Sequence, residues 1–192
     1  YRFVLVDALG NPIFDVDNIT AVNDVGALLV QLASTTPPTG ASLVGFKETD
    51  SGSVGRTVQL KLTDFVSVKD FGAACDDSTD DTAAIQAAID SVGDTSVNQR
   101  SGITLWFPGP CRITNTLTIR RKSIILAGNG WGYRTDTNAR RSWLRWDGAA
   151  GSPMLQVQDV SGFGIRNMRF IGKSTAKPTA AINFDETADG WP

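Results

Sequence analysis

The segment from Val66 to Asp90, VSVKDFGAACDDSTDDTAAIQAAID, constrains the fold of this chain more than any other. It predicts a short strand, a glycine-containing turn and one helix whose interior runs from Thr82 to Val92. The apolar residues of that helix recur at intervals of three and four, which places them on one face: Ile85, Ala88, Ile89 and Val92. Gly93 is the expected C-terminal stop. We therefore expect a helix that covers another surface like a lid.

The start of this helix also carries local signals. Ser78 or Thr79 is the expected N-cap residue, because a hydroxyl oxygen accepts from the first free backbone amides. Asp80 and Asp81 are expected in the first turn, where the helix dipole favours negative charge.

The order of the motifs resembles a known family. VSVKDFGA is followed by paired acids, by TDDTAAIQAAID and by the strand-like ITLWFPGPCRI, within a stretch from about Gly45 to Ile119. This order resembles the start of the pectate-lyase-like right-handed parallel β-helix, in the form found in tailspikes and depolymerase fibres of tailed bacteriophages. The resemblance implies a mainly β fold in which the helix plugs the N-terminal end of a solenoid and the strand ending in Phe-Pro opens its first coil.

Two residues depart from the family pattern. Asp77 stands where a glycine is common, and Cys111 where an aromatic residue is common. Asp tolerates the left-handed backbone conformation, and Cys packs as a small apolar residue, so we expect the fold to be retained.

The resemblance also implies a division of the chain into four parts. These are a small α+β virion-attachment module with its linker, a helical trimer neck, the β-helix cap, and the first coils of a truncated β-helix: residues 1–40, 41–65, 66–100 and 101–192.

The residue pattern before the cap predicts small elements. Two short strands are expected within residues 1–22, and Asn23 or Asp24 is expected to cap a helix from Val25 to Ala33. Residues 34–40, STTPPTG, predict a stiff polar linker.

A second helix is expected from Val54 to Asp64. Val54, Val58 and Leu62 form a narrow apolar stripe, which suits packing about a three-fold axis. A helix packed only on its own cap explains the same stripe, and the residues alone do not choose between these interpretations. The family resemblance favours the homotrimer.

From Ser101 the pattern changes to short apolar runs separated by Gly, Asn, Pro and Ser. The expected strands are Thr104–Phe107, Cys111–Thr114, Leu117–Ile119, Ile124–Ala127, Trp143–Trp146, Met154–Val157, Phe163–Ile171 and Ala181–Phe184. Leu117–Ala127 and Gly162–Gly172 are interpreted as corresponding walls of two coils. In the second wall, Ile165 and Phe170 are expected to face the core, and Asn167 to bend the chain. Without the cap, an antiparallel sandwich would explain these runs equally well.

Composition bounds the remaining possibilities. No apolar run approaches the ~20 residues that a membrane span needs. Residues 1–100 hold 6 basic and 14 acidic side chains, whereas residues 101–192 hold 12 basic and 6 acidic ones, which suits either an anionic partner or solvated loops. Cys75 and Cys111 are interpreted as two free buried thiols in preference to a disulfide. The first residue is Tyr1 and no closing cap follows the last strand, so we expect a fragment of a longer protein.

Candidate chemistry is sparse. The sequence contains no His, which excludes a His-containing triad or metal site. Glycoside cleavage needs two carboxylates facing one bond, and the acids available in the expected solenoid are Asp136, Asp147, Asp159, Asp185, Glu186 and Asp189. We assign no catalytic, cofactor-binding or metal-binding residue. The acidic run before the helix is interpreted as capping in preference to cation binding: Asp76, Asp77, Asp80 and Asp81.

The five tryptophans suggest sugar stacking, although packing is the preferred interpretation. Trp106 is expected in the core, and the other four lie in or near the basic segment that contains Arg140, Arg141 and Arg145: Trp131, Trp143, Trp146 and Trp191.

By resemblance, then, the expected parent protein is a homotrimeric phage tailspike located on the virion tail. Residues 1–40 would bind a tail or baseplate protein, and coils outside this segment would bind and degrade a bacterial surface polysaccharide, as a lyase or a hydrolase. No nucleic acid, membrane partner or cofactor is expected. The alternatives are a non-enzymatic adhesive fibre and a cellular pectin-degrading β-helix enzyme.

Overall fold

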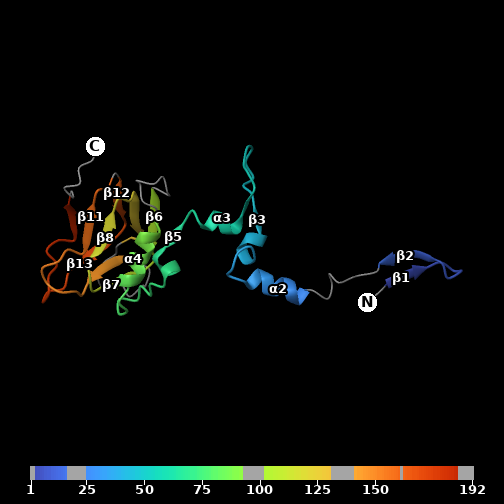
Figure 1. Cartoon of the computed structure of the whole chain (residues 1–192), viewed down its shortest axis with the longest axis horizontal. Coiled ribbons are helices and arrows are strands. Elements are labelled where there is room, and N and C mark those ends of the chain that lie inside the picture. The colour runs from blue at the N-terminus through green and yellow to red at the C-terminus, as the bar shows by residue number, and fades with distance from the viewer. Residues whose placement is uncertain (1–2, 17–24, 93–101, 131–140, 161, 186–192) are drawn as a thin grey trace. The chain divides into compact units, whose positions relative to one another are not determined.

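The computed structural model describes residues 3–16, 25–92, 102–130, 141–160 and 162–185 (Figure 1). The chain divides into two compact units, Tyr1–Thr63 and Asp64–Pro192. Within the described residues, no helix combines the length and the apolar character that crossing a membrane requires.

The first unit begins with the two strands that the sequence predicts. β1 (Phe3–Val6) and β2 (Pro12–Val16) form an antiparallel pair. The turn between them is held by the carboxylate of Asp7, which accepts hydrogen bonds from the backbone amides of Leu9 and Asn11 at 2.9 and 2.8 Å. α2 (Val25–Ala33) has the predicted bounds, and the proposed caps Asn23 and Asp24 lie outside the described residues.

The rest of the first unit differs from the expected single helix. A 3₁₀ turn, η1 (Gly40–Leu43), is followed by β3 (Gly45–Phe46) and β4 (Arg56–Thr57), which pair antiparallel. α3 covers only Val58–Leu62, because the Thr57 hydroxyl accepts from the Leu60 amide and starts the helix there. The expectation of a helix from Val54 is therefore wrong, and Val54 lies before β4.

The second unit opens with the cap. β5 (Val66–Ser67) leads into a 3₁₀ turn, η2 (Val68–Phe71), where Ser67 and Asp70 form a reciprocal capping box and Gly72 takes a left-handed φ of 93°. α4 spans Thr82–Ser91. Its predicted apolar face is confirmed, since the whole stripe is buried in the core: Ile85, Ala88, Ile89 and Val92.

After α4 the chain winds through three sheets. Among the residues that the structure describes after α4, nine strands follow in order: β6 (Ile103–Phe107), β7 (Pro110–Ile113), β8 (Leu117–Arg120), β9 (Ile124–Gly128), β10 (Trp143–Trp146), β11 (Leu155–Gln158), β12 (Phe163–Arg166), β13 (Arg169–Ile171) and β14 (Ile182–Asp185). The sheets are ordered β12-β9-β6-β5, β13-β10-β7 and β14-β11-β8, and every pairing is parallel. Each coil thus gives one strand to each sheet, which is the topology of a parallel β-helix.

The strand register places apolar residues of successive coils above one another inside the solenoid. Leu105, Leu126 and Ile165 form one inward row, and equivalent rows run through Cys111–Leu144–Phe170 and Leu117–Leu155–Ile182. Ile165 and Phe170 pack against the core, as predicted. Asn167 bends the chain with a left-handed φ of 54°, which confirms its predicted corner role.

One repeat assignment from the sequence is half wrong. β9 and β12 do correspond, since they pair in one sheet. β8 pairs with β11, however, whereas β13 pairs with β10, so Leu117–Ala127 and Gly162–Gly172 are offset by one wall. The segments between strands differ in length from coil to coil, and this hides the true repeat.

Candidate functional site: the cap loop and its contacts with the coils

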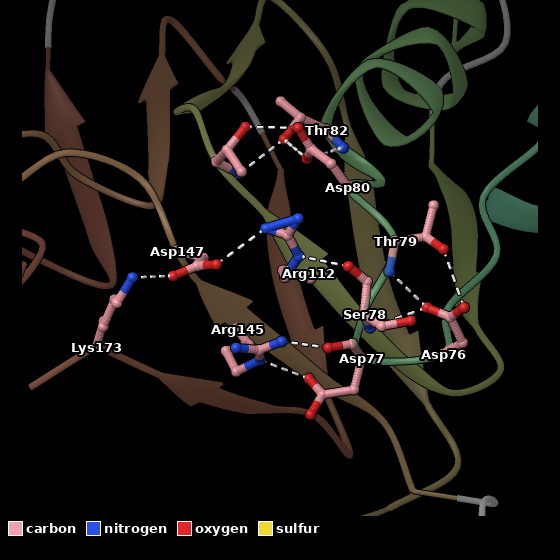
Figure 2. Close-up of polar contacts among 11 residues, drawn as sticks. Asp76, Asp77, Ser78, Thr79, Asp80, Thr82, Arg112, Arg145, Asp147 and Lys173 are labelled. Atoms are coloured by element: carbon pink, nitrogen blue, oxygen red, sulfur yellow. Dashed lines mark hydrogen bonds and ion pairs between the residues drawn. The ribbon is translucent and has the colours of Figure 1, made fainter.

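The loop before α4 lies along β7. The Asp77 amide donates to the Pro110 carbonyl at 2.8 Å and the Asp81 amide to the Arg112 carbonyl at 2.9 Å, with a parallel bridge between Asp80 and Arg112. The loop therefore continues the sheet of β7, β10 and β13 by one short edge segment, and the side chains of Asp77 and Asp80 reach the coils, whereas Asp76 bonds within the loop (Figure 2).

Asp81 occupies a different role from the one expected. It is the N-cap residue by position, but its side chain makes no capping bond to α4. Its buried carboxylate accepts from the amides of Ala74 and Cys75 at 2.7 and 3.1 Å. Burial raises the pKa of this carboxyl, and the hydrogen bonds from the two backbone amides oppose that shift. The expected capping by Ser78 or Thr79 is therefore wrong, because the preceding loop folds back on Asp81 instead.

The Asp76 carboxylate shapes the loop itself. It accepts from the amides of Thr79 and Ser78 at 2.7 and 2.9 Å, and from the Thr79 hydroxyl. The hydrogen bond from the Thr79 backbone amide has the largest effect on the pKa of Asp76, and that from the Ser78 amide the next largest. Together they hold this pKa well below its ordinary value.

A ladder of ion pairs joins the cap loop to three successive coils. Arg145 on β10 donates from Nε to the Asp77 carboxylate at 2.7 Å and also bonds the Asp77 carbonyl. Arg112 on β7 bonds the Ser78 carbonyl and pairs with Asp147 at 2.9 Å. Lys173, which follows β13, pairs with the same Asp147 at 2.5 Å, so the ladder reaches the third coil (Figure 2).

α4 is also bonded to the first coil along its length. The Thr82 hydroxyl accepts from the Thr114 amide at 2.9 Å. Gln86 exchanges two hydrogen bonds with the backbone of Thr118, each 2.9 Å long. At the C-terminal end, Lys122 donates to the carbonyls of Asp90 and Val92.

These helix contacts were missed from the sequence, although a signal was present. The helix residues Thr82, Gln86 and Asp90 are spaced by four, and so are their partners in the first coil, which are Thr114, Thr118 and Lys122. The signal is weak, because four residues advance about 6 Å along a helix and about 13 Å along an extended strand, so equal spacing alone does not predict which residues meet.

The cysteine prediction is wrong. Cys75 in the cap loop and Cys111 on β7 form a disulfide, which the left-handed backbone at Cys75 and the pairing of loop and strand bring about. Together with Asp81 they form a buried group of potential metal ligands within the described residues. Because both sulfurs are joined to each other, neither offers a thiolate to a metal ion.

The acidic run of the cap loop contains the carboxylates of Asp76, Asp77, Asp80 and Asp81. In the structure each of its carboxylates bonds its own protein partners, and Asp80 accepts from the hydroxyls of Thr82 and Thr114 at 2.6 Å each. Hydrogen-bond donors of the cap and the coils therefore contact these carboxylates, and their interpretation as caps in preference to a cation site stays a prediction.

The carboxylates considered for catalysis are placed as follows. Asp147 belongs to the ion ladder, and Asp159 lies within 3.5 Å of Arg120 and 4.0 Å of Arg121. Asp185 ends β14 and is exposed. The others lie outside the described residues: Asp136, Glu186 and Asp189.

The tryptophans separate by face. Trp146 is buried in the core. Trp106 is half-buried on the outer face, where its ring contacts Phe65 with centroids 5.4 Å apart, so the prediction of a core position is wrong. The reason is alternation, because Leu105 and Phe107 occupy the inward positions of β6.

Trp143 is half-buried on the outer face of β10 and donates to Asp77 at 3.0 Å. Trp131 and Trp191 lie outside the described residues.

The fold and cap together define a parallel β-helix of the pectate-lyase-like class. The family model for rhamnogalacturonase A/epimerase, pectate lyase-like, matches residues 65–187. The chain belongs to this family.

Individual relatives come from phages and from bacteria. A tail spike protein of an Escherichia phage is 48% identical over 52 residues, which is 27% of this chain and 6% of that protein. Mannuronan C5-epimerase AlgE6 of Azotobacter vinelandii is 32% identical over 133 residues, 65% of this chain and 14% of that protein. Among solved structures, ORF18 of Geobacillus virus E2 is 22% identical with a TM-score of 0.48, covering 71% of this chain and 29% of that one.

These similarities confirm the resemblance to phage tailspikes with a pectate-lyase-like β-helix. The chain spans a small part of each curated relative.

Proposed function

We propose that this chain is the N-terminal part of a phage tailspike. It attaches the spike to the virion tail and starts a β-helix that binds, and in the longer protein degrades, a host surface polysaccharide. The observation that carries the proposal is a capped parallel β-helix in a chain that shares 48% identity over 52 residues with a phage tail spike protein.

We propose that the residues that cleave the polysaccharide lie outside this segment. The acids of the cap loop, Asp147 and Asp159 all bond or pair with neighbouring groups of the cap and coils. A carboxylate committed to such contacts is poorly placed to exchange protons with a substrate. Residues 1–40 are proposed as the attachment module and residues 41–65 as the neck.

A homotrimer is proposed from the surface of the first unit. Among the side chains of this unit that the structure describes, no large apolar one is buried. Several are instead exposed, including Leu29 at 61%, Val30 at 72% and Leu62 at 61%. Exposed apolar side chains such as these gain stability when they are buried against copies of the same chain.

The proposal is tested on purified virions. Antibodies against this chain are expected to label the tail in electron micrographs, and labelling confined to the capsid, or none at all, would refute attachment to the tail. Light scattering of the purified chain is expected to give three times the chain mass. Leu62→Glu is expected to lower that mass, whereas the control Glu48→Gln, at an exposed polar position, keeps it.

The epimerase relative supports a second candidate, a cellular enzyme that modifies a polysaccharide. A monomeric full-length protein that is absent from virions would favour it.

A further inference from the structure

Trp143 and Arg169 are neighbours on the outer face of one sheet. The register of β10 pairs Trp143 with Arg169 on β13 and with Pro110 on β7. Paired residues of parallel strands stand about 5 Å apart and point to the same face. The half-buried indole and the exposed guanidinium therefore share one surface.

The indole is held in place before any ligand arrives. Its Nε1 donates to the Asp77 carboxylate at 3.0 Å, and the same oxygen accepts from Arg145 Nε at 2.7 Å. Arg145 thereby neutralises Asp77 beside the ring. A ring that is already fixed loses little conformational freedom on binding, which favours affinity.

The charges on this face are predominantly positive. The cations are Arg112, Arg145, Arg169 and Lys173, and the acids that contact them are Asp77 and Asp147, both in ion pairs. The cap-loop acids Asp76 and Asp80 are occupied by threonine and backbone donors. Within the described part of the chain, the Arg169 guanidinium has no hydrogen-bond or ion-pair partner. It therefore remains available to an anion.

We propose that Trp143 and Arg169 form a subsite for one anionic sugar unit of a polysaccharide. The indole stacks on the apolar face of the sugar ring, and the guanidinium binds its carboxylate through paired hydrogen bonds. This rests on the proposed function, and it places sugar binding in the first coils as well as in coils outside this chain.

Fluorescently labelled polygalacturonate is the anionic probe, and labelled dextran is the neutral one. The whole chain is expected to bind the first in preference to the second. Arg169→Gln is expected to weaken polygalacturonate binding about tenfold, since it removes a charged hydrogen-bond donor. Trp143→Leu keeps apolar volume but removes the ring, and it is expected to weaken binding as well. Circular dichroism verifies that each variant is folded.

Arg166→Gln is the matched control, because the Arg166 side chain is also exposed and without a partner among the described residues but lies on β12, in another sheet. It is expected to leave binding unchanged. Three results would each overturn the subsite. The two arginine variants lose polygalacturonate affinity equally, or the native chain binds a single-stranded oligonucleotide as tightly as polygalacturonate, or the native chain does not bind polygalacturonate. None of these results bears on tail labelling of virions, so the subsite and the proposed function fail separately.

Discussion

At the scale of single residues, a few side chains fix backbone that would otherwise be unfavourable. Asp81 satisfies two amides of the cap loop from a buried position. Asn167 turns the chain between β12 and β13 with a left-handed φ, which Asn accepts at lower cost than most residues. These contacts are local, but each one sets where a strand or helix begins.

Asn167 gives a simple test of corner strain. Asn167→Ala is expected to lower the free energy of unfolding by about 1 kcal/mol, because alanine resists the left-handed region. Asn167→Gly is the control, since glycine adopts that region freely. Urea unfolding followed by tryptophan fluorescence measures both, and an alanine variant as stable as the glycine variant would contradict the assignment.

Asp147 gives a test by pH. Its hydrogen bond to Lys173 lowers its pKa below the ordinary 3.8, helped by the charges of Lys173 and Arg112. A lowered pKa means that the stabilisation is present above about pH 4 and is lost as the pH falls through the folded-state value.

Asp147→Asn is therefore expected to show a smaller fall in thermal midpoint between about pH 6 and about pH 3 than the native chain does. Asp81, whose pKa is raised, acts in the opposite direction and is common to both proteins. If the thermal midpoint of Asp147→Asn fell as much as that of the native chain, the ion pairs of Asp147 would contribute nothing to stability.

At the scale of elements, α4 is held to the first coil by two kinds of contact. Its apolar face enters the core, and its polar edge is bonded at Thr82, Gln86 and the C-terminal carbonyls. In a sheet, the amide and the carbonyl of Thr118 would bond to a neighbouring strand. Here the side chain of Gln86 bonds both of these β8 groups instead. The helix therefore closes the solenoid as well as covering it.

Gln86→Ala is expected to destabilise the second unit by about 1–2 kcal/mol, since the two hydrogen bonds to Thr118 and the one to the Asp90 carboxylate are lost while helix propensity improves. The Thr118 amide is expected to exchange with solvent faster. Ala87→Gln, at an exposed position of the same helix, is the control. Unchanged exchange at Thr118 would mean that the Gln86 bonds do not protect β8.

At the scale of the whole molecule, the two units obtain their stability differently. The second has a continuous core along three stacked sheets, reinforced by the disulfide between cap and β7. The described side chains of the first have no such core, and we propose that copies of the chain supply it.

The disulfide is expected to contribute about 4 kcal/mol, given the 36-residue separation of its cysteines. Unfolding of the native chain with and without a phosphine reductant measures this contribution. The double variant Cys75→Ala, Cys111→Ala reports on the same loss without reductant. Equal stability with and without the reductant would show that the bond is absent or without effect.

The sequence predicts most of the second unit, because periodicity and turn residues are local signals. The stripe on α4 and nearly all strands of the coils lie where the residue pattern puts them. What it missed depends on distance in space. The pairing of Cys75 with Cys111, the outward position of Trp106 and the ladder from Asp77 to Lys173 follow from how coils stack, and unequal turns between strands hide that stacking from the sequence.

The disulfide also changes what a protease can achieve. A single cut anywhere between Cys75 and Cys111 would leave the two pieces joined through their sulfurs. The nicked protein would migrate as one molecule on a non-reducing gel and as two after reduction. For a protein proposed to work outside a cell, a cut in this part of the chain would thus not detach the cap from the first coil.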